Sequence, residues 1–204
     1  MEEVIDNDIA APLDNRIFAL ILQHPRERRN MLATAELIPA LLRQSRLAVG
    51  LSWANLSHAL GHPAEAGEWA ALHLGSACPE AFGRAELVAL DRRGVPDERR
   101  AALAGLAGIV LLDGTWQEAK TLWWRNPWLQ RLRRLVLNPR EGAHYGRVRR
   151  EPRRAALSTL EAAALALSRL EGRPELERAL LARLDRLIAE APPVRRPPHR
   201  RVRR

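Results

Sequence analysis

The stretch LLDGTWQEAKTLWW, Leu111 to Trp124, decides the fold, because an apolar run ends there at an aspartate and a helix-like pattern follows at once. The apolar run predicts a strand that is covered on both faces, and the pattern after it predicts a helix. Asp113 lies at the junction. It suits two roles, capping the helix, which aspartate does well, or chemistry at the end of a buried strand. Thr115 is an equally good cap, which would leave Asp113 for the second role.

Short apolar runs alternate with helix-like segments along the whole chain, which predicts an open, largely parallel α/β sheet with helices on both faces. The expected strands are 17–22, 47–52, 69–74, 85–91, 106–113 and 133–138. The expected helices are 34–44 with Thr34 as N-cap, 115–126, 158–172 and 174–191. Pro39 should bend or delay the first helix. Ser158 and Glu161 form a capping box for the third, and Gly172 suits its C-terminal stop.

The chain of 204 residues suits one α/β domain, and its composition of 47% hydrophobic and 28% charged residues predicts a globular protein. We expect a flexible lead-in at 1–15, a single domain at 16–191 and a disordered Arg/Pro-rich tail at 192–204. No apolar run approaches the roughly 18 residues of a membrane helix, and the acidic start is unlike a signal peptide. We therefore expect a cytoplasmic protein that does not bind membranes.

The formal charge of +9 comes almost wholly from arginine, since Lys120 is the single lysine. Residues 125–154 hold ten arginines and two glutamates, with His144 and Tyr145 interleaved. Arginines that contact phosphates beside groups that stack on bases are typical of RNA-binding proteins, although a solvated charged face is the usual alternative. Cys78 is the lone cysteine, which excludes an intramolecular disulfide and a cysteine-based zinc site. We expect no metal.

Three polar residues, Asp91, Asp113 and Asn138, each follow a predicted strand. In parallel α/β sheets ligands bind beyond the carboxyl ends of strands, so these positions are candidates for a site. The chain has no G-x-G-x-x-G, P-loop or G-x-S-x-G motif, so the usual nucleotide-cofactor and serine-hydrolase sites lack support.

Histidine and tryptophan residues give weaker signals. His58 and His62 lack the glutamate of a metalloprotease helix, which favours a loop or surface pair. Trp116 is next to the predicted loop. Three further tryptophans are expected to be core and helix-packing residues: Trp123, Trp124 and Trp128.

Four stretches together resemble one family. LDGTWQEAK is similar to the D-x-T-W signature of the DTW-domain proteins, the tRNA-uridine aminocarboxypropyltransferases, and ILQHPRERRN resembles their Q-H-P-x-E segment. LVLNP followed by YGRVRREP resembles their Asn-Pro strand end and Tyr/Arg-rich loop, and LSTLEAAALAL their L-S-T-x-E-A helix. The resemblance covers about Ile17 to Leu170. Many bacterial relatives begin with a metal-binding-like cysteine cluster that this chain lacks, which leaves tRNA docking to the arginines.

The resemblance implies a SPOUT-like fold with a C-terminal trefoil knot around S-adenosylmethionine. It implies transfer of the 3-amino-3-carboxypropyl group of S-adenosylmethionine to N3 of a tRNA uridine. Asp113 is then the candidate base for the uridine proton, with a pKa that burial would raise, and Thr115 and Trp116 complete the catalytic group. Trp116 would wall the pocket or stack on a base.

The remaining implied site residues are of two kinds. The expected cofactor-binding residues are Leu90, Leu112, Leu135, Val136, Leu137, Ser158 and Thr159. The expected RNA-binding residues are His24, Arg147, Arg149 and Arg150. The expected partners are tRNA and S-adenosylmethionine, with no protein partner. Three alternatives stay open: a SPOUT-type RNA methyltransferase, an rRNA aminocarboxypropyltransferase and a non-catalytic RNA-binding module.

Overall fold

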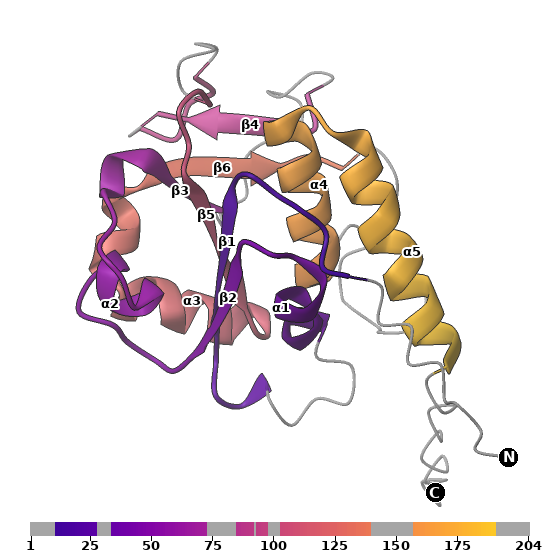
Figure 1. Ribbon diagram of the computed structural model, residues 1–204. Coiled ribbons are helices and arrows are strands. Elements are labelled where there is room, and N and C mark those ends of the chain that lie inside the picture. Colours follow the sequence, from indigo (N-terminus) through magenta and orange to yellow (C-terminus); the bar gives the residue numbers. More distant parts are fainter. Residues whose placement is uncertain are drawn as a thin grey trace, which may run out of the picture.

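The computed structural model describes residues 11–27, 34–72, 85–91, 93–97, 103–139 and 157–190, which form a six-stranded sheet with helices on both faces (Figure 1). The strands are β1 (Phe18–Gln23), β2 (Ser45–Val49), β3 (Trp69–Leu72), β4 (Leu87–Leu90), β5 (Gly108–Asp113) and β6 (Arg133–Leu137). The α-helices are α1 (Ile38–Leu41), α2 (Leu56–Leu60), α3 (Trp116–Arg125), α4 (Thr159–Glu171) and α5 (Pro174–Glu190). Three short 3₁₀ helices are η2 (Thr34–Leu37), η3 (Ala66–Glu68) and η6 (Pro127–Arg131).

The strand order is β2-β1-β5-β3-β6-β4, and every neighbouring pair is parallel except β4 with β6. The prediction of a largely parallel α/β sheet is therefore confirmed. The exception matters for the site. Leu90, at the end of β4, pairs with Arg134 near the start of β6. Leu90 and Asp91 therefore lie at the opposite end of the sheet from the carboxyl ends of the parallel strands.

The expectation that Asp91 lies at the ligand-binding edge is thus wrong, because an apolar run does not reveal the direction in which its strand will pair. Asp91 instead stabilises the turn that follows β4. Its Oδ1 accepts hydrogen bonds from the backbone N–H groups of Arg93 and Val95, each at 2.8 Å.

Two layers of helices cover the sheet, with α1, α4 and α5 on one face and α2, α3 and η6 on the other (Figure 1). Side chains of a strand alternate between faces. In β5, Ile109 and Leu111 pack with the α4 layer, and Val110 packs with the α3 layer. Asp113 continues the series of Ile109 and Leu111, so its side chain lies on the α4 face of the sheet.

The local signals around α4 and α5 are confirmed. The Ser158 hydroxyl accepts from the Glu161 N–H at 3.3 Å, and Glu161 Oε2 accepts from the Ser158 N–H at 2.7 Å, which completes the capping box. Gly172 ends α4 with φ of 68°, a left-handed conformation that glycine adopts readily. Pro174 is the first residue of α5.

Pro39 delays the first α-helix, as predicted. The chain forms the 3₁₀ helix η2 first, and α1 begins at Ile38. Pro39 then lies in the first turn of α1, where its missing N–H removes no intrahelical hydrogen bond. Thr34, the predicted N-cap, is instead the first residue of η2.

The prediction that three tryptophans are packing residues is confirmed for two of them and wrong for the third. Trp123 and Trp128 are each 8% exposed and belong to the core beneath α3, which confirms them as packing residues. The same prediction is wrong for Trp124, which is 69% exposed. Successive helical residues are rotated by about 100°, so a buried Trp123 turns its neighbour toward solvent.

The histidine pair lies at the surface, as predicted, although a short helix was missed there. His58 is exposed on α2, and His62 is exposed just after it. The Asn55 side chain caps α2 by accepting from the His58 N–H at 2.8 Å, and Gly61 ends the helix with φ of 79°.

The end of the expected lead-in contacts the domain. Leu13 N–H donates to Leu41 O at 2.8 Å, and the buried Asn15 donates through Nδ2 to Gln44 O at 2.9 Å. Residues 1–10, the 140–156 segment and the 192–204 tail lie outside the described residues. The expected C-terminal trefoil knot stays a prediction.

Candidate functional site

Asp113 is held from two sides at the carboxyl edge of the sheet. Gln23 Nε2 donates a hydrogen bond to Asp113 Oδ2 at 2.9 Å, and Thr159 Oγ1 donates to Oδ1 at 2.5 Å. The parallel register pairs Gln23 with Asp113 as the last residues of β1 and β5. Asp113 is 7% exposed. Three elements, β1, β5 and α4, therefore converge on one buried carboxylate.

Gln23 has one unsatisfied polar atom. Its side chain is completely buried, and since its amide nitrogen faces the carboxylate, Oε1 has no hydrogen-bond partner. Buried polar atoms are almost always satisfied, and an unmade hydrogen bond costs about 1–3 kcal/mol. Gln23 thus places an unsatisfied acceptor beside Asp113.

The N-terminus of α4 adds a favourable electrostatic environment. Thr159 is the first residue of α4, and Ser158 is its buried N-cap. The free N–H groups of a helix's first turn attract negative charge, so a carboxylate or an anionic ligand is stabilised there. The structure thus brings Ser158 and Thr159, two of the predicted cofactor-binding residues, to the Asp113 edge.

Gly114 gives the turn after Asp113 its shape. Its φ is +149°, and a Cβ at this position would lie 2.9 Å from Glu118 Cβ and 3.3 Å from His24 Cβ. Glycine is therefore required between Asp113 and the helix cap Thr115.

Thr115 caps α3 in a second capping box, which confirms that Asp113 is not needed as the cap. Glu118 Oε2 accepts from the Thr115 N–H at 2.9 Å and from its hydroxyl at 2.8 Å, and the Glu118 N–H lies 3.4 Å from Thr115 Oγ1. Glu118 Oε1 lies 3.5 Å from His24 Nδ1. Burial, the largest influence, acts to raise the pKa of Glu118, but the Thr115 hydrogen bonds and the charges of His24 and Arg26 outweigh it and lower the pKa.

Trp116 lies at the rim of this site. It is the first residue of α3 and is 49% exposed, and Lys120 Nζ lies 5.2 Å from the centroid of its ring system. This distance is within the range of a cation–π interaction. Lys120 therefore lies over one face of the indole, and much of the remaining indole surface contacts solvent.

The predicted cofactor-binding residues of β5 and β6 lie at the same edge. β3 separates the two strands and ends at Leu72, whose partner is Leu135. Leu112 of β5, and Val136 and Leu137 of β6, therefore extend past the end of β3 on its two sides. Leu90 is not brought together with them, because antiparallel β4 ends at the other end of the sheet.

Of the four predicted RNA-binding residues, the structure describes His24. His24 N–H donates to Asp113 O at 2.9 Å, and the residue is 8% exposed. Its Nδ1 also lies 3.3 Å from the Arg26 N–H. The three arginines of this group, Arg147, Arg149 and Arg150, lie outside the described residues.

Within the described ranges, no group of three or more His, Cys, Asp or Glu side chains is arranged to hold a metal ion. In the same part of the chain, none of the helices has the length and apolar character needed to cross a membrane.

The DTW domain model matches residues 1–191 of the chain. The protein belongs to the DTW domain family. Its curated relatives include tRNA-uridine aminocarboxypropyltransferase 2 of Drosophila melanogaster, 33% identical over 176 residues, which are 82% of this chain and 62% of that protein. The namesake proteins of Macaca fascicularis and Mus musculus are 29% and 26% identical over 183 and 178 residues. These cover 88% and 87% of this chain and 56% of each relative.

This DTW domain thus spans little more than half the length of the curated relatives that it matches. No solved structure gives a significant match. The family resemblance seen in the sequence is confirmed. The stretches that carry it, from β1, β5 and α4, supply Asp113 and the two side chains that donate to it.

Two residues of this DTW domain site had no predicted role. Gln23 ends an apolar run as Asp113 does, and that shared pattern is the signal that could have paired them. Glu118 is three residues after Thr115, which is the spacing of a capping box.

Proposed function

We propose that this protein transfers the 3-amino-3-carboxypropyl group of S-adenosylmethionine to N3 of a uridine in tRNA. The observation that carries the proposal is the buried Asp113 carboxylate, which Gln23 and Thr159 hold at the carboxyl edge of the sheet. The names of the curated relatives support the same activity.

The residues at this edge fit S-adenosylmethionine. The first turn of α4 suits the carboxylate of the methionine arm. Leu112, Val136 and Leu137 supply backbone and apolar surface on either side of the end of β3. Leu90 is left out of this proposed cradle because of its position in β4. When bound, S-adenosylmethionine supplies an electrophilic methylene carbon next to its sulfonium.

Asp113 acts as the base in this proposal. It accepts the proton of uridine N3, the nitrogen forms a bond to the methylene carbon, and the carbon–sulfur bond breaks to leave methylthioadenosine as a neutral thioether. Gln23 and Thr159 orient the carboxylate, and positioning of this kind supplies much of the rate of a two-substrate reaction.

Thr115 fixes the turn that presents Asp113, and Trp116 stacks on a base or walls the pocket. In the same proposal His24, Arg147, Arg149 and Arg150 contact the tRNA, and the C-terminal part of the chain forms a SPOUT-like trefoil knot around S-adenosylmethionine.

Incubation of the protein with isotopically labelled S-adenosylmethionine and unmodified bulk tRNA tests the activity, followed by mass spectrometry of the nucleosides. We expect uridine that carries the labelled aminocarboxypropyl group. Labelled methyluridine would instead establish a methyltransferase. Product in a parallel incubation with rRNA, and none with tRNA, would identify the other RNA class. Salt-dependent tRNA binding without any labelled nucleoside would establish a binding module.

A further inference from the structure

Helix α3 carries two exposed tryptophans on one side. Trp116 is 49% exposed and Trp124 is 69% exposed, and Lys120 lies between them with its ammonium 5.2 Å from the Trp116 ring. The three residues are spaced at i, i+4 and i+8, so they form a continuous stripe along the helix surface. We call these residues the Trp–Lys stripe. Tryptophan is mostly buried in folded proteins, so two on one helix face suggest a binding surface.

The stripe begins at the Asp113 site and leads away from it. Trp116 follows Asp113 by three residues. A helix rises 1.5 Å per residue, so Trp124 lies about 12 Å further along α3. A chain that enters the site at Asp113 and lies along α3 would meet both indoles.

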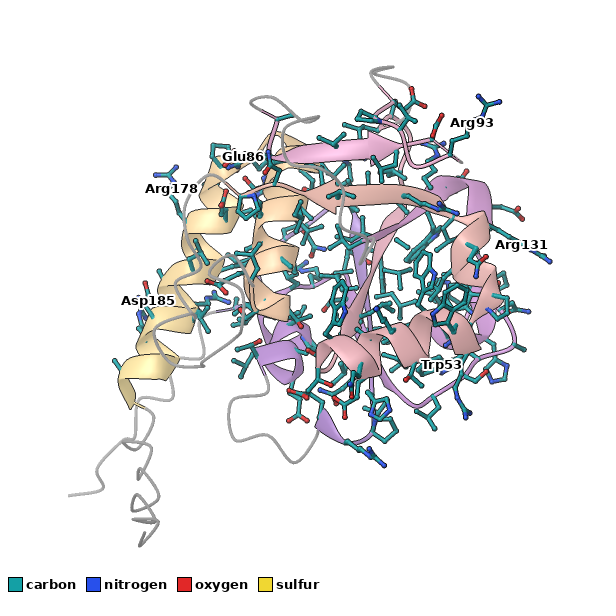
Figure 2. The ribbon with its side chains drawn as sticks, turned by 180° about the vertical axis from the view of Figure 1, so that it is seen from behind. Trp53, Glu86, Arg93, Arg131, Arg178 and Asp185 are labelled. Atoms are coloured by element: carbon teal, nitrogen blue, oxygen red, sulfur yellow. The ribbon has the colours of Figure 1, made fainter. Side chains whose placement is uncertain are left out.

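Both ends of α3 are anchored, which makes the stripe a rigid platform. The Thr115–Glu118 capping box fixes the first turn. At the other end Asn126 Oδ1 accepts from the Trp53 N–H at 2.8 Å, and Asn126 Nδ2 donates to Leu51 O at 3.1 Å. Figure 2 shows Trp53 at this end of α3. A platform that is fixed before binding loses little conformational freedom when a partner docks.

The charge of the stripe favours a polyanion. Lys120 contributes a solvent-facing cation, and Arg125 is exposed at the end of the helix. Glu118 is the single acidic residue of α3, and its carboxylate is engaged with Thr115 and His24. The whole chain has a formal charge of +9. Indole faces stack on bases of any sequence, and a lysine between two such faces can contact the phosphates that link stacked bases.

We propose that the Trp–Lys stripe binds unpaired nucleotides next to the target uridine, with one base stacked on Trp124 and a phosphate at Lys120. This inference rests on the proposed function, since it takes the RNA substrate from there. It adds Lys120 and Trp124, which lie outside the chemical site, as residues that hold the RNA.

The test is equilibrium binding of a fluorescein-labelled, unmodified tRNA transcript to the full chain, without S-adenosylmethionine, at several salt concentrations. Trp124→Ala should weaken binding by about five- to 150-fold, the range for loss of one stacked base, with an unchanged salt dependence. Trp124→Phe should restore most of the affinity. Lys120→Gln should weaken binding and reduce the log–log salt slope by about 0.7, the value for one lost phosphate contact on a single strand. Val95→Ala, which removes an exposed apolar side chain beyond β4, is the matched control and should bind as wild type.

A second probe separates stacking from general charge. Trp124→Ala should lose affinity for a short single-stranded RNA but not for the duplex of the same sequence, because paired bases are not free to stack on an indole. Equal losses on both RNAs would overturn the stacking assignment.

The outcomes also separate this inference from the proposed function. Trp124-dependent tRNA binding by a wild-type protein that forms no aminocarboxypropyl-uridine would leave the stripe standing and remove the proposed activity. Wild-type transfer with unchanged tRNA affinity and KM in Trp124→Ala would overturn the stripe and leave the activity standing.

Discussion

Thr159 Oγ1 donates a hydrogen bond of 2.5 Å to Asp113 Oδ1, which joins the first residue of α4 to the last residue of β5. The two residues are 46 positions apart, and each belongs to a stretch that carries the family resemblance. Hydrogen bonds from a hydroxyl to an ionised carboxylate have lengths of about 2.5–2.7 Å. The contact therefore fixes the carboxylate relative to the N-terminus of α4, where an anionic group of a ligand is also favoured.

Asp113→Asn should reduce aminocarboxypropyl transfer by about 10²- to 10⁴-fold, the usual contribution of a general base. Asparagine keeps the size of the side chain and an acceptor for Thr159, and a rotated Gln23 amide can turn its oxygen to the new N–H₂ group. The thermal midpoint should therefore change little. The rate is measured from labelled nucleoside per unit time. Asp91→Asn is the matched control, since Asp91 also follows a strand but lies at the opposite end of the sheet. Equal rates for Asp113→Asn and wild type would remove Asp113 as the base.

Gln23→Leu should lower kcat by roughly 10²-fold, the effect of a small misplacement of a reacting group, while the KM for tRNA stays the same. Leucine removes both the donor to Asp113 and the unsatisfied Oε1. The variant should still fold, because Gln23 follows Ala19 and Ile21 on the apolar α4 face of the sheet, where a buried apolar side chain is accommodated. Gln130→Leu, the same change at an exposed position of η6, should behave as wild type. A rise in the KM for tRNA with an unchanged kcat would contradict an orienting role for Gln23.

The sequence predicted those parts of the fold whose signals are local. The continuous apolar runs of β1 and β5, and the capping residues Thr115 and Ser158, depend on neighbours within a few positions, and the structure confirms each of them. The direction of β4 and the contact between Gln23 and Asp113 depend on pairing between distant segments, which periodicity does not encode. Trp124 was misassigned because a tryptophan-rich pattern reveals apolar content and not which indole faces the core.

Glu118→Gln should destabilise the protein by about 0.3–1 kcal/mol at neutral pH, the usual size of a charge effect at a helix N-terminus. Glutamine retains the acceptor of the capping box and removes only the charge. The lowered pKa of Glu118 means that its ionised form stabilises the fold above its usual pKa of 4.5, and that this stabilisation disappears as the pH falls through the lowered value. Urea unfolding at a series of pH values should therefore show the two stabilities converging as the pH falls below the usual pKa of 4.5. A difference that does not shrink as Glu118 is protonated would contradict the assignment.

Gly114→Ala should destabilise the protein by about 1–3 kcal/mol, since a residue with a side chain is strained at φ of +149° and the new Cβ would lie 2.9 Å from Glu118 Cβ. Relief of that contact would displace the turn that presents Asp113, so transfer should fall by more than the loss of folded protein explains. Urea unfolding and the labelled-nucleoside assay measure the two effects on the same samples. Gly67→Ala is the matched control, because no atom lies within 4 Å of its added Cβ and its φ is not in the restricted positive range. A Gly114→Ala variant with the stability and rate of Gly67→Ala would show that the turn tolerates a side chain and that its conformation does not position Asp113.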